Sequence, residues 1–264
     1  MGRMPIKQQH GQQRVVVTGG ASGIGRAMVD AFLESGALVH VADLPGHGDD
    51  LPDGVGSTAC DVSLPEDVDR LFDDAVTFLG SVDVLCNNVG IAGPTGPVEE
   101  VDIVGWDKTM AVNVRSTFLC CRRVAPLMRE AGGGVILNTS STAGVVGFPL
   151  RSPYAASKWA VVGLGATLAM ELGEFGIRVN TLCPGSVGGD RMDRVIAAES
   201  AATGVTAADV RGFYEDQVSM RTFVDGRDIA AMAVFLASPD ARYVNGQVIA
   251  VDGGLESLRT TFRT

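Results

Sequence analysis

The sequence has neither an excess nor a cluster of basic residues. Its 21 lysines and arginines are outnumbered by 31 aspartates and glutamates, which gives a formal net charge of −10 and a pI near 4.7. Proteins that bind nucleic acid normally present a basic patch to the phosphates. The composition therefore argues against nucleic acid as a partner.

Long hydrophobic runs are absent too. No stretch of the chain holds the roughly 18 or more consecutive apolar residues of a membrane-spanning helix. The amino-terminal stretch MGRMPIKQQHGQQR is polar and lacks the apolar segment of a secretory signal. We therefore expect a cytoplasmic protein that is neither exported nor inserted into a membrane.

Cysteines are few and irregularly spaced. The chain has five, an odd number, and Cys120 and Cys121 are adjacent in a segment of helical character. This pattern fits neither a disulfide framework nor the spacing of metal ligands. We expect reduced thiols and no metal site.

Glycine and apolar residues are abundant, with 34 glycines and 46% hydrophobic residues in 264. Apolar runs alternate with segments of helical period. Strands are expected at 14–18, 37–43, 57–62, 82–88, 134–140, 177–184 and 246–254. Helices are expected at 24–36, at 65–79, over about 102–130 and around Tyr154. Strands that are apolar on both faces and alternate with helices predict an α/β fold. We expect a single-domain, Rossmann-like, doubly wound parallel sheet of about seven strands with helices on both faces.

No repeat, low-complexity tract or Pro/Ser-rich linker divides the chain, so residues 1–264 are expected to form one domain. Residues 186–223 interrupt the alternation of strands and helices. They include a segment that we expect to be helical from near Thr206, with this threonine as the N-cap. Long excursions from a rigid sheet are often lids, and we expect this one to be a substrate loop or lid.

A glycine-rich stretch, TGGASGIG at 18–25, joins the first expected strand to the first helix. Glycine permits a tight turn there and lets the backbone approach a pyrophosphate, while the helix N-terminus offers free N–H groups. The position of the stretch in a strand-turn-helix unit predicts a dinucleotide site.

Asp43 ends the second expected strand, eighteen residues after Gly25. A carboxylate at this place can accept hydrogen bonds from both adenosine ribose hydroxyls and would repel a 2′-phosphate. The glycine stretch also contains no Arg or Lys to neutralise such a phosphate. The residues favour NAD over NADP, and the alternative is an aspartate that merely caps a loop before Pro45.

The stretch SPYAASKWAVVGLG at 152–165 places Tyr154 four residues before Lys158. On a helix this spacing brings the phenol and the ammonium to one face, where the cation can polarise the hydroxyl. Taken alone, such a pair is more often a core tyrosine and a solvated lysine.

Several motifs together resemble the short-chain dehydrogenase/reductase family. TGGASGIG looks like the family's T-G-x-x-x-G-x-G signature, CDV (60–62) its D-V element, and NNVG (87–90) its N-N-A-G with Val89 for Ala. Ser141 stands the family's usual thirteen residues before Tyr154. CPGSV (183–187) resembles its P-G turn, and VDGG (251–254) the end of its last strand. The similarity spans about 14–254.

The resemblance implies a catalytic set of Asn113, Ser141, Tyr154 and Lys158. Tyr154 would be the acid/base for hydride transfer between a secondary alcohol or ketone and the nicotinamide. Lys158 would hold the nicotinamide ribose and stabilise the phenolate. Ser141 would donate a hydrogen bond to the substrate oxygen, with Ser140 as the competing assignment. Asn113 would keep a helix kink and a water that links Lys158 to solvent.

The resemblance also implies a set of cofactor-binding residues: Gly19, Ser22, Gly23, Ile24, Gly25, Asp43, Asp61, Val62, Asn88, Gly90, Tyr154, Lys158, Pro184, Gly185 and Val187. Gly189 departs from the family pattern, which often has Thr at this position. One cofactor contact is thereby in doubt, and the loop would be more mobile.

The expected substrate pocket draws on the long excursion and on the loops near 91–97 and 145–151. The candidates are Val145, Phe148, Leu150, Arg151, Arg191, Met192, Phe213, Tyr214 and Met220. Most of them would make an apolar cavity. Arg151 or Arg191 could bind a carboxylate. The alternative is that each is a surface arginine that offsets part of the negative charge of the protein.

Small and apolar residues cover more than one face of the segments 102–130 and 153–172, which predicts self-association, with a homotetramer implied by the family. Three alternatives to an NAD-dependent alcohol dehydrogenase stay open. One is an NADPH-dependent carbonyl or 3-oxoacyl reductase. Another is a sugar epimerase or dehydratase, whose usual extra domain the chain could not accommodate. The last is a dinucleotide-binding regulator without turnover.

Overall fold

The computed structural model describes residues 12–48 and 50–255. Seven strands form one sheet in the order β3-β2-β1-β4-β5-β6-β7, and every pairing is parallel. Their bounds are β1 Arg14–Thr18, β2 Leu38–Asp43, β3 Gly56–Ala59, β4 Val84–Asn87, β5 Gly134–Thr139, β6 Ile177–Pro184 and β7 Val248–Val251. The strand order reverses between β1 and β4, and open α/β sheets bind ligands beyond the carboxyl ends of the strands at such a point.

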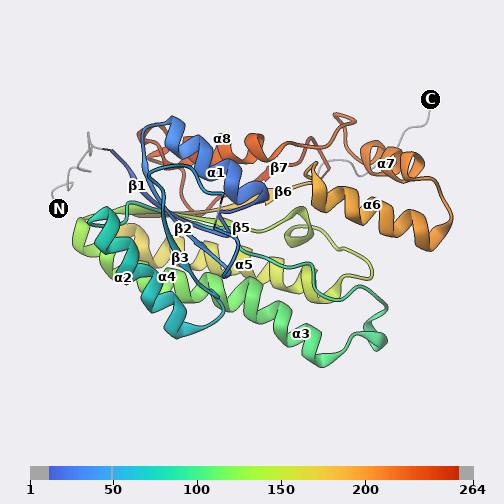
Figure 1. The fold of residues 1–264 in the computed structure, drawn as a ribbon, viewed down its shortest axis with the longest axis horizontal. Helices are drawn as coiled ribbons and strands as arrows, with labels where there is room; N and C mark the ends of the chain where they lie inside the picture. Colours follow the sequence, from blue (N-terminus) through green and yellow to red (C-terminus); the bar gives the residue numbers. More distant parts are fainter. Residues whose placement is uncertain (1–11, 49, 256–264) are drawn as a thin grey trace.

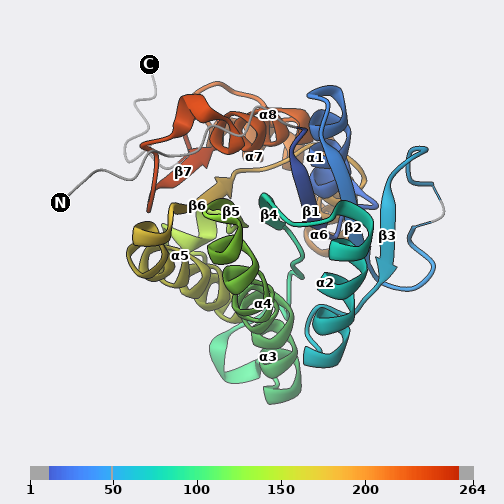
Figure 2. The ribbon, with the colours of Figure 1, turned by 90° about the vertical axis from the view of Figure 1, so that its left-hand side faces the viewer.

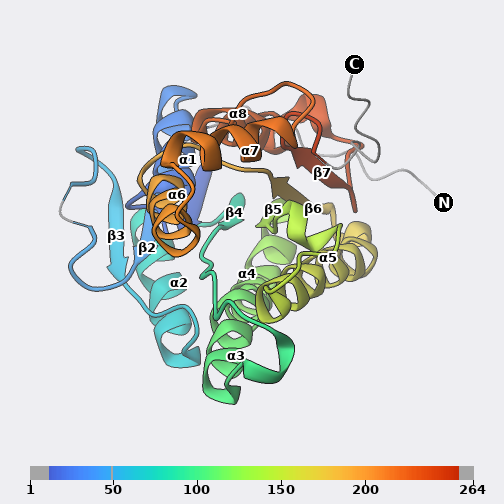
Figure 3. The ribbon, with the colours of Figure 1, turned by 90° about the vertical axis from the view of Figure 1, so that its right-hand side faces the viewer.

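Helices cover both faces of this sheet (Figures 2 and 3). On one face lie α1 Gly23–Glu34 and α8 Gly226–Ala237. On the other lie α2 Pro65–Leu79, α4 Ser116–Ala131 and α5 Ser152–Leu172. The predicted fold class, a Rossmann-like doubly wound sheet of about seven strands, is confirmed.

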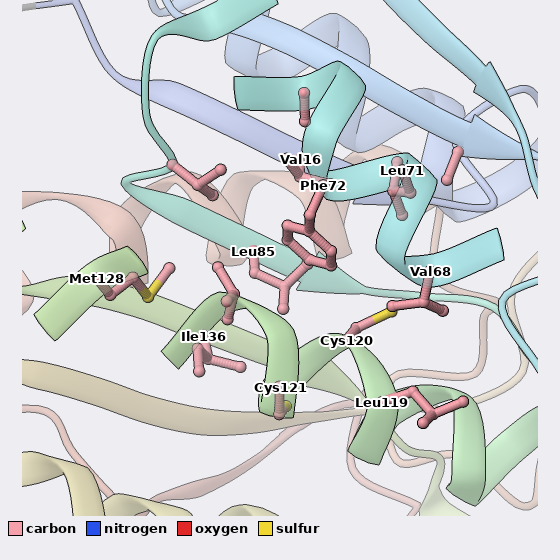
Figure 4. Packing of buried hydrophobic residues seen from close by; sticks show 14 of the residues in the cluster. Val16, Val68, Leu71, Phe72, Leu85, Leu119, Cys120, Cys121, Met128 and Ile136 are labelled. Carbon is pink, nitrogen blue, oxygen red and sulfur yellow. The ribbon is translucent and has the colours of Figure 1, made fainter. Parts of the chain in front are cut away.

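Alternate residues of the central strands supply two separate cores, because successive side chains point to opposite faces of the sheet. Val16 packs toward α2 and α4 with Leu71 and Phe72, as Figure 4 shows. Its neighbours Val15 and Val17 pack toward α1 and α8. Each fully buried side chain of this size contributes about 1.5–3 kcal/mol. The central strands are therefore apolar throughout and rigid enough to position the loops at their ends.

The helix expected over about 102–130 has three parts. Helix α3, Ile103–Met110, passes into a π-helical turn, Ala111–Arg115, and then into α4. Such turns insert an extra residue into the helical ladder and are frequent at functional sites. Asn113 lies within this one.

The structure adds α8, a helix that the sequence interpretation did not assign. The Asp225 side chain accepts a hydrogen bond from the Arg227 backbone, and the Asp228 side chain accepts one from the Asp225 backbone, which makes a capping box. Ile229 and Ala230 are fully buried against the sheet. The paired aspartates before an apolar segment were a readable signal for a helix start.

The segment 186–223 folds into α6 Asp190–Thr203 and α7 Ala207–Asp216. As expected, Thr206 caps α7, with its hydroxyl accepting from the Asp209 backbone N–H at 3.2 Å. Figure 1 shows both helices at the end of the sheet where β6 stops. They lie on the side where a ligand of this fold would bind.

Two kinds of feature are absent from the described residues. None of their helices is long and apolar enough to cross a membrane. No three of their His, Cys, Asp or Glu side chains are grouped so that they could hold a metal ion.

Candidate active site

The turn between β1 and α1 requires glycine at three places. Gly19 and Gly23 have φ of +66° and +55°, in the left-handed region that favours glycine. A Cβ on Gly25 would lie 1.9 Å from the carbonyl oxygen of Gly19. The chain therefore folds tightly back on itself and leaves the backbone uncovered at the start of α1.

The N-terminus of α1 has free backbone donors. Its N-cap, Ser22, makes no side-chain capping hydrogen bond, and no acidic residue lies in the first turn. Unsatisfied N–H groups and the positive end of the helix dipole favour a bound phosphate. With Ile24 in the first turn, this cradle fits the pyrophosphate of a dinucleotide.

Asp43 and Asn88 border the same turn. One carboxylate oxygen of Asp43 accepts from the Ala21 N–H at 3.0 Å, and the other accepts from the Leu44 N–H at 2.8 Å. The Asn88 amide donates to the carbonyls of Thr18 and Gly19 at 3.2 and 3.3 Å. Asp43 thus caps the following loop and also lies at the glycine turn, so the two readings of this residue are compatible.

Asp61 and Val62 lie beyond the end of β3. Oδ1 of Asp61 accepts from the Ser63 N–H and hydroxyl at 2.9 and 2.7 Å. Val62 is 4% exposed and packs in the core against α2, so only its backbone is available to a cofactor.

Lys158 is buried beside Tyr154. It is 4% exposed, its ammonium donates to the Thr139 carbonyl at 3.0 Å, and Nζ lies 5.8 Å from the centroid of the Tyr154 ring. A Cβ on Gly90 would lie 3.0 Å from this Nζ. A buried cation needs polar partners. The bare backbone of Gly90 leaves room for the ammonium.

Asn113 connects the π turn to the loop after β4 and to α5 by hydrogen bonds. Its Oδ1 accepts from the Ile91 N–H at 2.8 Å, and its Nδ2 donates to the Ile91 carbonyl at 3.0 Å and to the Ser157 hydroxyl at 2.9 Å. Asn113 is 1% exposed. It fixes the loop after β4 against α5, one residue from Lys158.

The two competing serines differ in what their hydroxyls do. The Ser140 hydroxyl donates to the Lys158 carbonyl at 2.8 Å, and this serine is 3% exposed. The Ser141 oxygen accepts from the Ala143 N–H at 3.2 Å and, among the described residues, its proton has no acceptor. Ser141 is also only half-buried, so its hydroxyl is the one that can still donate to a ligand.

Comparison with known proteins decides which family combines these features. The profile of a family described as "Enoyl-(Acyl carrier protein) reductase" matches residues 19–256. The chain is 36% identical over 251 residues to (+)-borneol dehydrogenase 2 of Salvia officinalis, covering 92% of this chain and 88% of the relative. The chain belongs to the short-chain dehydrogenase/reductase family.

Solved structures of short-chain dehydrogenase/reductases share the whole fold. Actinorhodin polyketide ketoreductase with NADPH superposes with a TM-score of 0.88 at 30% identity and covers 93% of this chain and 97% of its own. NAD⁺-bound xylitol dehydrogenase superposes with a TM-score of 0.85 at 27% identity and covers 92% and 98%. The protein is thus an oxidoreductase of alcohol and ketone groups, in a family that binds nicotinamide dinucleotides.

The loop after β6 holds Gly189, where the family often has Thr. Pro184 ends β6, and a Cβ on Gly185 would lie 2.7 Å from the Asp252 Cβ. Val187 pairs with Val224, which fixes the loop at its start. Gly189, at the N-cap of α6, has φ of +115°, a conformation that Thr would adopt only with strain. A threonine at this position would therefore be strained in the backbone conformation that Gly189 adopts here.

The residues expected to line the substrate pocket differ in how far they are buried. Val145, Arg151, Met192 and Tyr214 are half-buried. The phenol of Tyr214 donates to Glu199 at 2.9 Å, and burial, followed by this carboxylate, raises its pKa to about 12. Leu150, Phe213 and Met220 are 56%, 61% and 70% exposed. The side chain of Arg191 lies outside what the structure describes.

All five cysteines are buried. Burial raises the pKa of the Cys60, Cys86 and Cys121 thiols to about 12. Because the thiolate is the nucleophile, these three are inert at neutral pH.

Proposed function

We propose that the protein is an NAD-dependent oxidoreductase that transfers a hydride between a secondary alcohol or ketone and the nicotinamide, with Tyr154 as acid/base. The observation that carries this proposal is the buried Lys158 ammonium, which lies 5.8 Å from the Tyr154 ring centroid and is 4% exposed. A cation at this distance in a dry site stabilises the phenolate form.

Each member of the site has a task. In oxidation, the Tyr154 oxygen accepts the proton of the substrate hydroxyl, and in reduction it returns that proton to the carbonyl oxygen. The Ser141 hydroxyl donates to the same substrate oxygen and stabilises its developing charge. Asn113 and Lys158 hold the route by which a water would carry the proton onward. When bound, the nicotinamide supplies the hydride acceptor or donor.

The preference for NAD rests on Asp43. Its carboxylate lies at the glycine turn, where the Ala21 N–H donates to it at 3.0 Å. A 2′-phosphate there would place like charges close together, whereas free ribose hydroxyls would donate to the carboxylate. The glycine turn, with Asp61, Asn88, Gly90, Pro184, Gly185 and Val187, would hold the rest of the cofactor.

At the level of the whole chain, we propose one catalytic domain over residues 1–264, with 186–223 as a lid. The position of α6 and α7 over the carboxyl ends of the strands supports the lid. A cytoplasmic location and a homotetramer complete the proposal, and the exposed apolar residues of α4 and α5 support the second of these.

Two alternatives remain distinguishable. An NADPH-dependent carbonyl or 3-oxoacyl reductase is suggested by the likeness to an NADPH-bound ketoreductase, and Asp43 argues against it. A dinucleotide-binding regulator would not need Tyr154, Lys158 and Ser141 together.

A spectrophotometric screen at 340 nm tests the proposal. Aliphatic, aromatic, sugar and hydroxy-acid alcohols are offered with NAD and with NADP, beside a cofactor titration without substrate. We expect NADH formation with one class of secondary alcohol and a slower rate with NADP. Preferred turnover with NADP would favour the reductase, and NAD binding without turnover across the panel would favour the regulator.

A further inference from the structure

Arg151 lies next to the reacting tyrosine. It is the residue before α5 and stands three positions ahead of Tyr154. The carbon of its guanidinium is 5.2 Å from the centroid of the Tyr154 ring and 5.9 Å from that of Phe148. Lys158 lies farther along the same helix, toward β5, and its Nζ is 5.8 Å from the same ring centroid. Tyr154 therefore lies between two cations in the sequence and close to both in space.

The hydrogen bonds of this guanidinium are incomplete. One Nη donates to the Ala92 carbonyl at 3.3 Å, while Nε is buried and has no acceptor among the described residues. Within the described part of the chain, no carboxylate lies within 4 Å of Arg151. The next residue, Ser152, also has a buried hydroxyl without a partner in that part. Buried polar groups in folded proteins are normally satisfied.

The backbone holds Arg151 in this place. Leu150 has φ of +62°, which is uncommon for a residue with a branched side chain. Its carbonyl accepts from the Gly96 N–H at 2.9 Å, which joins the loop before α5 to the loop after β4. A strained residue held by a neighbouring loop is a recurrent feature of binding sites.

The charge around Tyr154 is positive, whereas the net charge of the whole protein is negative. The chain carries a formal charge of −10, yet Lys158 and Arg151 flank the phenol where the substrate must bind. The nearby Glu199 carboxylate is already bonded to Tyr214, at 2.9 Å. An arginine with free donors matches the geometry of a carboxylate and binds it with two parallel hydrogen bonds.

We propose that Arg151 is a substrate-binding residue that receives the carboxylate of a short hydroxy acid or oxo acid, whose reacting carbon lies at Tyr154. This inference rests on the proposed function and adds the class of substrate. It replaces the reading of Arg151 as a surface arginine, because the side chain is half-buried and pairs with no acidic residue that the structure describes.

The kinetic test compares 3-hydroxybutyrate with its methyl ester, which has the same skeleton without the charge. We expect the acid to be the better substrate. Arg151→Leu should lower kcat/KM for the acid by roughly 10- to 100-fold, mainly through KM, since a hydrogen bond to a charged group contributes about this much. The ester should be little affected, and Arg151→Lys should keep part of the activity on the acid. Arg242→Leu, a change at an exposed arginine whose guanidinium lies over the ring of Tyr243, is the matched control.

Binding is measured separately, so that this inference can fail apart from the proposed function. Butyrate should raise the melting temperature of the NADH-bound protein, butyramide should not, and Arg151→Leu should abolish the difference. Turnover of neither substrate would count against the proposed function, while the butyrate result would still decide about Arg151. Equal losses for acid and ester, a preference for the ester, or no binding of butyrate would overturn the inference.

Discussion

Among single residues, Lys158 is tightly held in the site. Its ammonium is buried, donates to the Thr139 carbonyl and lies 3.0 Å from where a Cβ at position 90 would stand. Burying a cation costs free energy even when hydrogen bonds compensate for part of it. A lysine in this position is better explained by its effect on Tyr154 than by a gain in stability.

Asp43 is the residue on which the preference for NAD over NADP is expected to depend. Asp43→Ala removes the carboxylate that we expect to bind the ribose hydroxyls and repel a 2′-phosphate. The ratio of kcat/KM with NAD to that with NADP should therefore fall by about tenfold or more, since one such polar contact contributes about 1.4 kcal/mol or above.

The matched control is Asp53→Ala, which removes an exposed carboxylate from the loop between β2 and β3. This variant should keep the parent's ratio, because its charge lies in solvent and is screened. An unchanged ratio in Asp43→Ala would remove Asp43 from the cofactor site.

At the scale of elements, β2, β3 and α2 share a polar chain that runs from buried His40 to exposed Asp74. His40 on β2 is 2% exposed, and its Nε2 lies 2.9 Å from the Thr58 hydroxyl of β3. That hydroxyl donates to Asp74 of α2 at 2.8 Å. Nε2 is therefore the protonated nitrogen, an assignment from the hydrogen-bond pattern. Burial lowers the pKa of His40, and the charge of Asp74 opposes this shift only in part.

This lowered pKa predicts how stability depends on pH. The folded protein keeps His40 neutral, whereas an unfolded histidine binds a proton near pH 6.5. The contribution of His40 is therefore fully present above about pH 6.5 and is lost as the pH falls toward the folded-state pKa. Between pH 7.5 and 5.5 this loss is at most about 1.4 kcal/mol of unfolding free energy.

Urea unfolding at the two pH values checks the effect. His40→Gln should show a smaller drop in unfolding free energy than the parent, and His47→Gln, a change at an exposed histidine, should show the full drop. Equal drops in all three proteins would contradict the role given to His40.

The elements also show what the sequence could and could not predict. The strands and most helices follow from apolar periodicity, and α8 was missed although Asp225 and Asp228 marked its start. The π turn at Asn113 has no periodic signal and was anticipated only as a kink implied by the family. Ser140 and Ser141 differ in the structure because the Ser140 hydroxyl donates to the Lys158 carbonyl. The contacts of Arg151 depend on a loop distant in sequence, which supplies the Ala92 carbonyl. The thirteen-residue interval to Tyr154 favours Ser141, but neither the hydrogen bonds of the two serines nor the contacts of Arg151 can be predicted from local spacing.

At the scale of the whole molecule, the exposed apolar residues of α4 and α5 bear on its oligomeric state. Phe118 of α4 and Trp159 and Met170 of α5 are 47%, 50% and 86% exposed, and Figure 2 shows the two helices side by side on one face. Apolar residues gathered on a surface favour association with another chain. This arrangement supports the proposed homotetramer.

Met170→Asp would place a charge in that surface, and we expect it to reduce the mass in solution from that of a tetramer to that of a dimer or monomer. Burying an unpaired carboxylate in an interface is costly. Light scattering measures the mass, and Met220→Asp, at another exposed methionine, serves as the control. A parent protein with the mass of one 27.4 kDa chain would contradict the tetramer.

Substitution of Tyr154 separates binding of the cofactor from turnover. Tyr154→Phe removes only the hydroxyl, and Tyr243→Phe removes one from a tyrosine that is 78% exposed. We predict that Tyr154→Phe keeps the parent's affinity for NADH, measured by nicotinamide fluorescence, and loses at least about 100-fold in kcat, as removal of an acid/base does. Tyr243→Phe should match the parent in both. Undiminished kcat in Tyr154→Phe would contradict the assignment of Tyr154 as the acid/base.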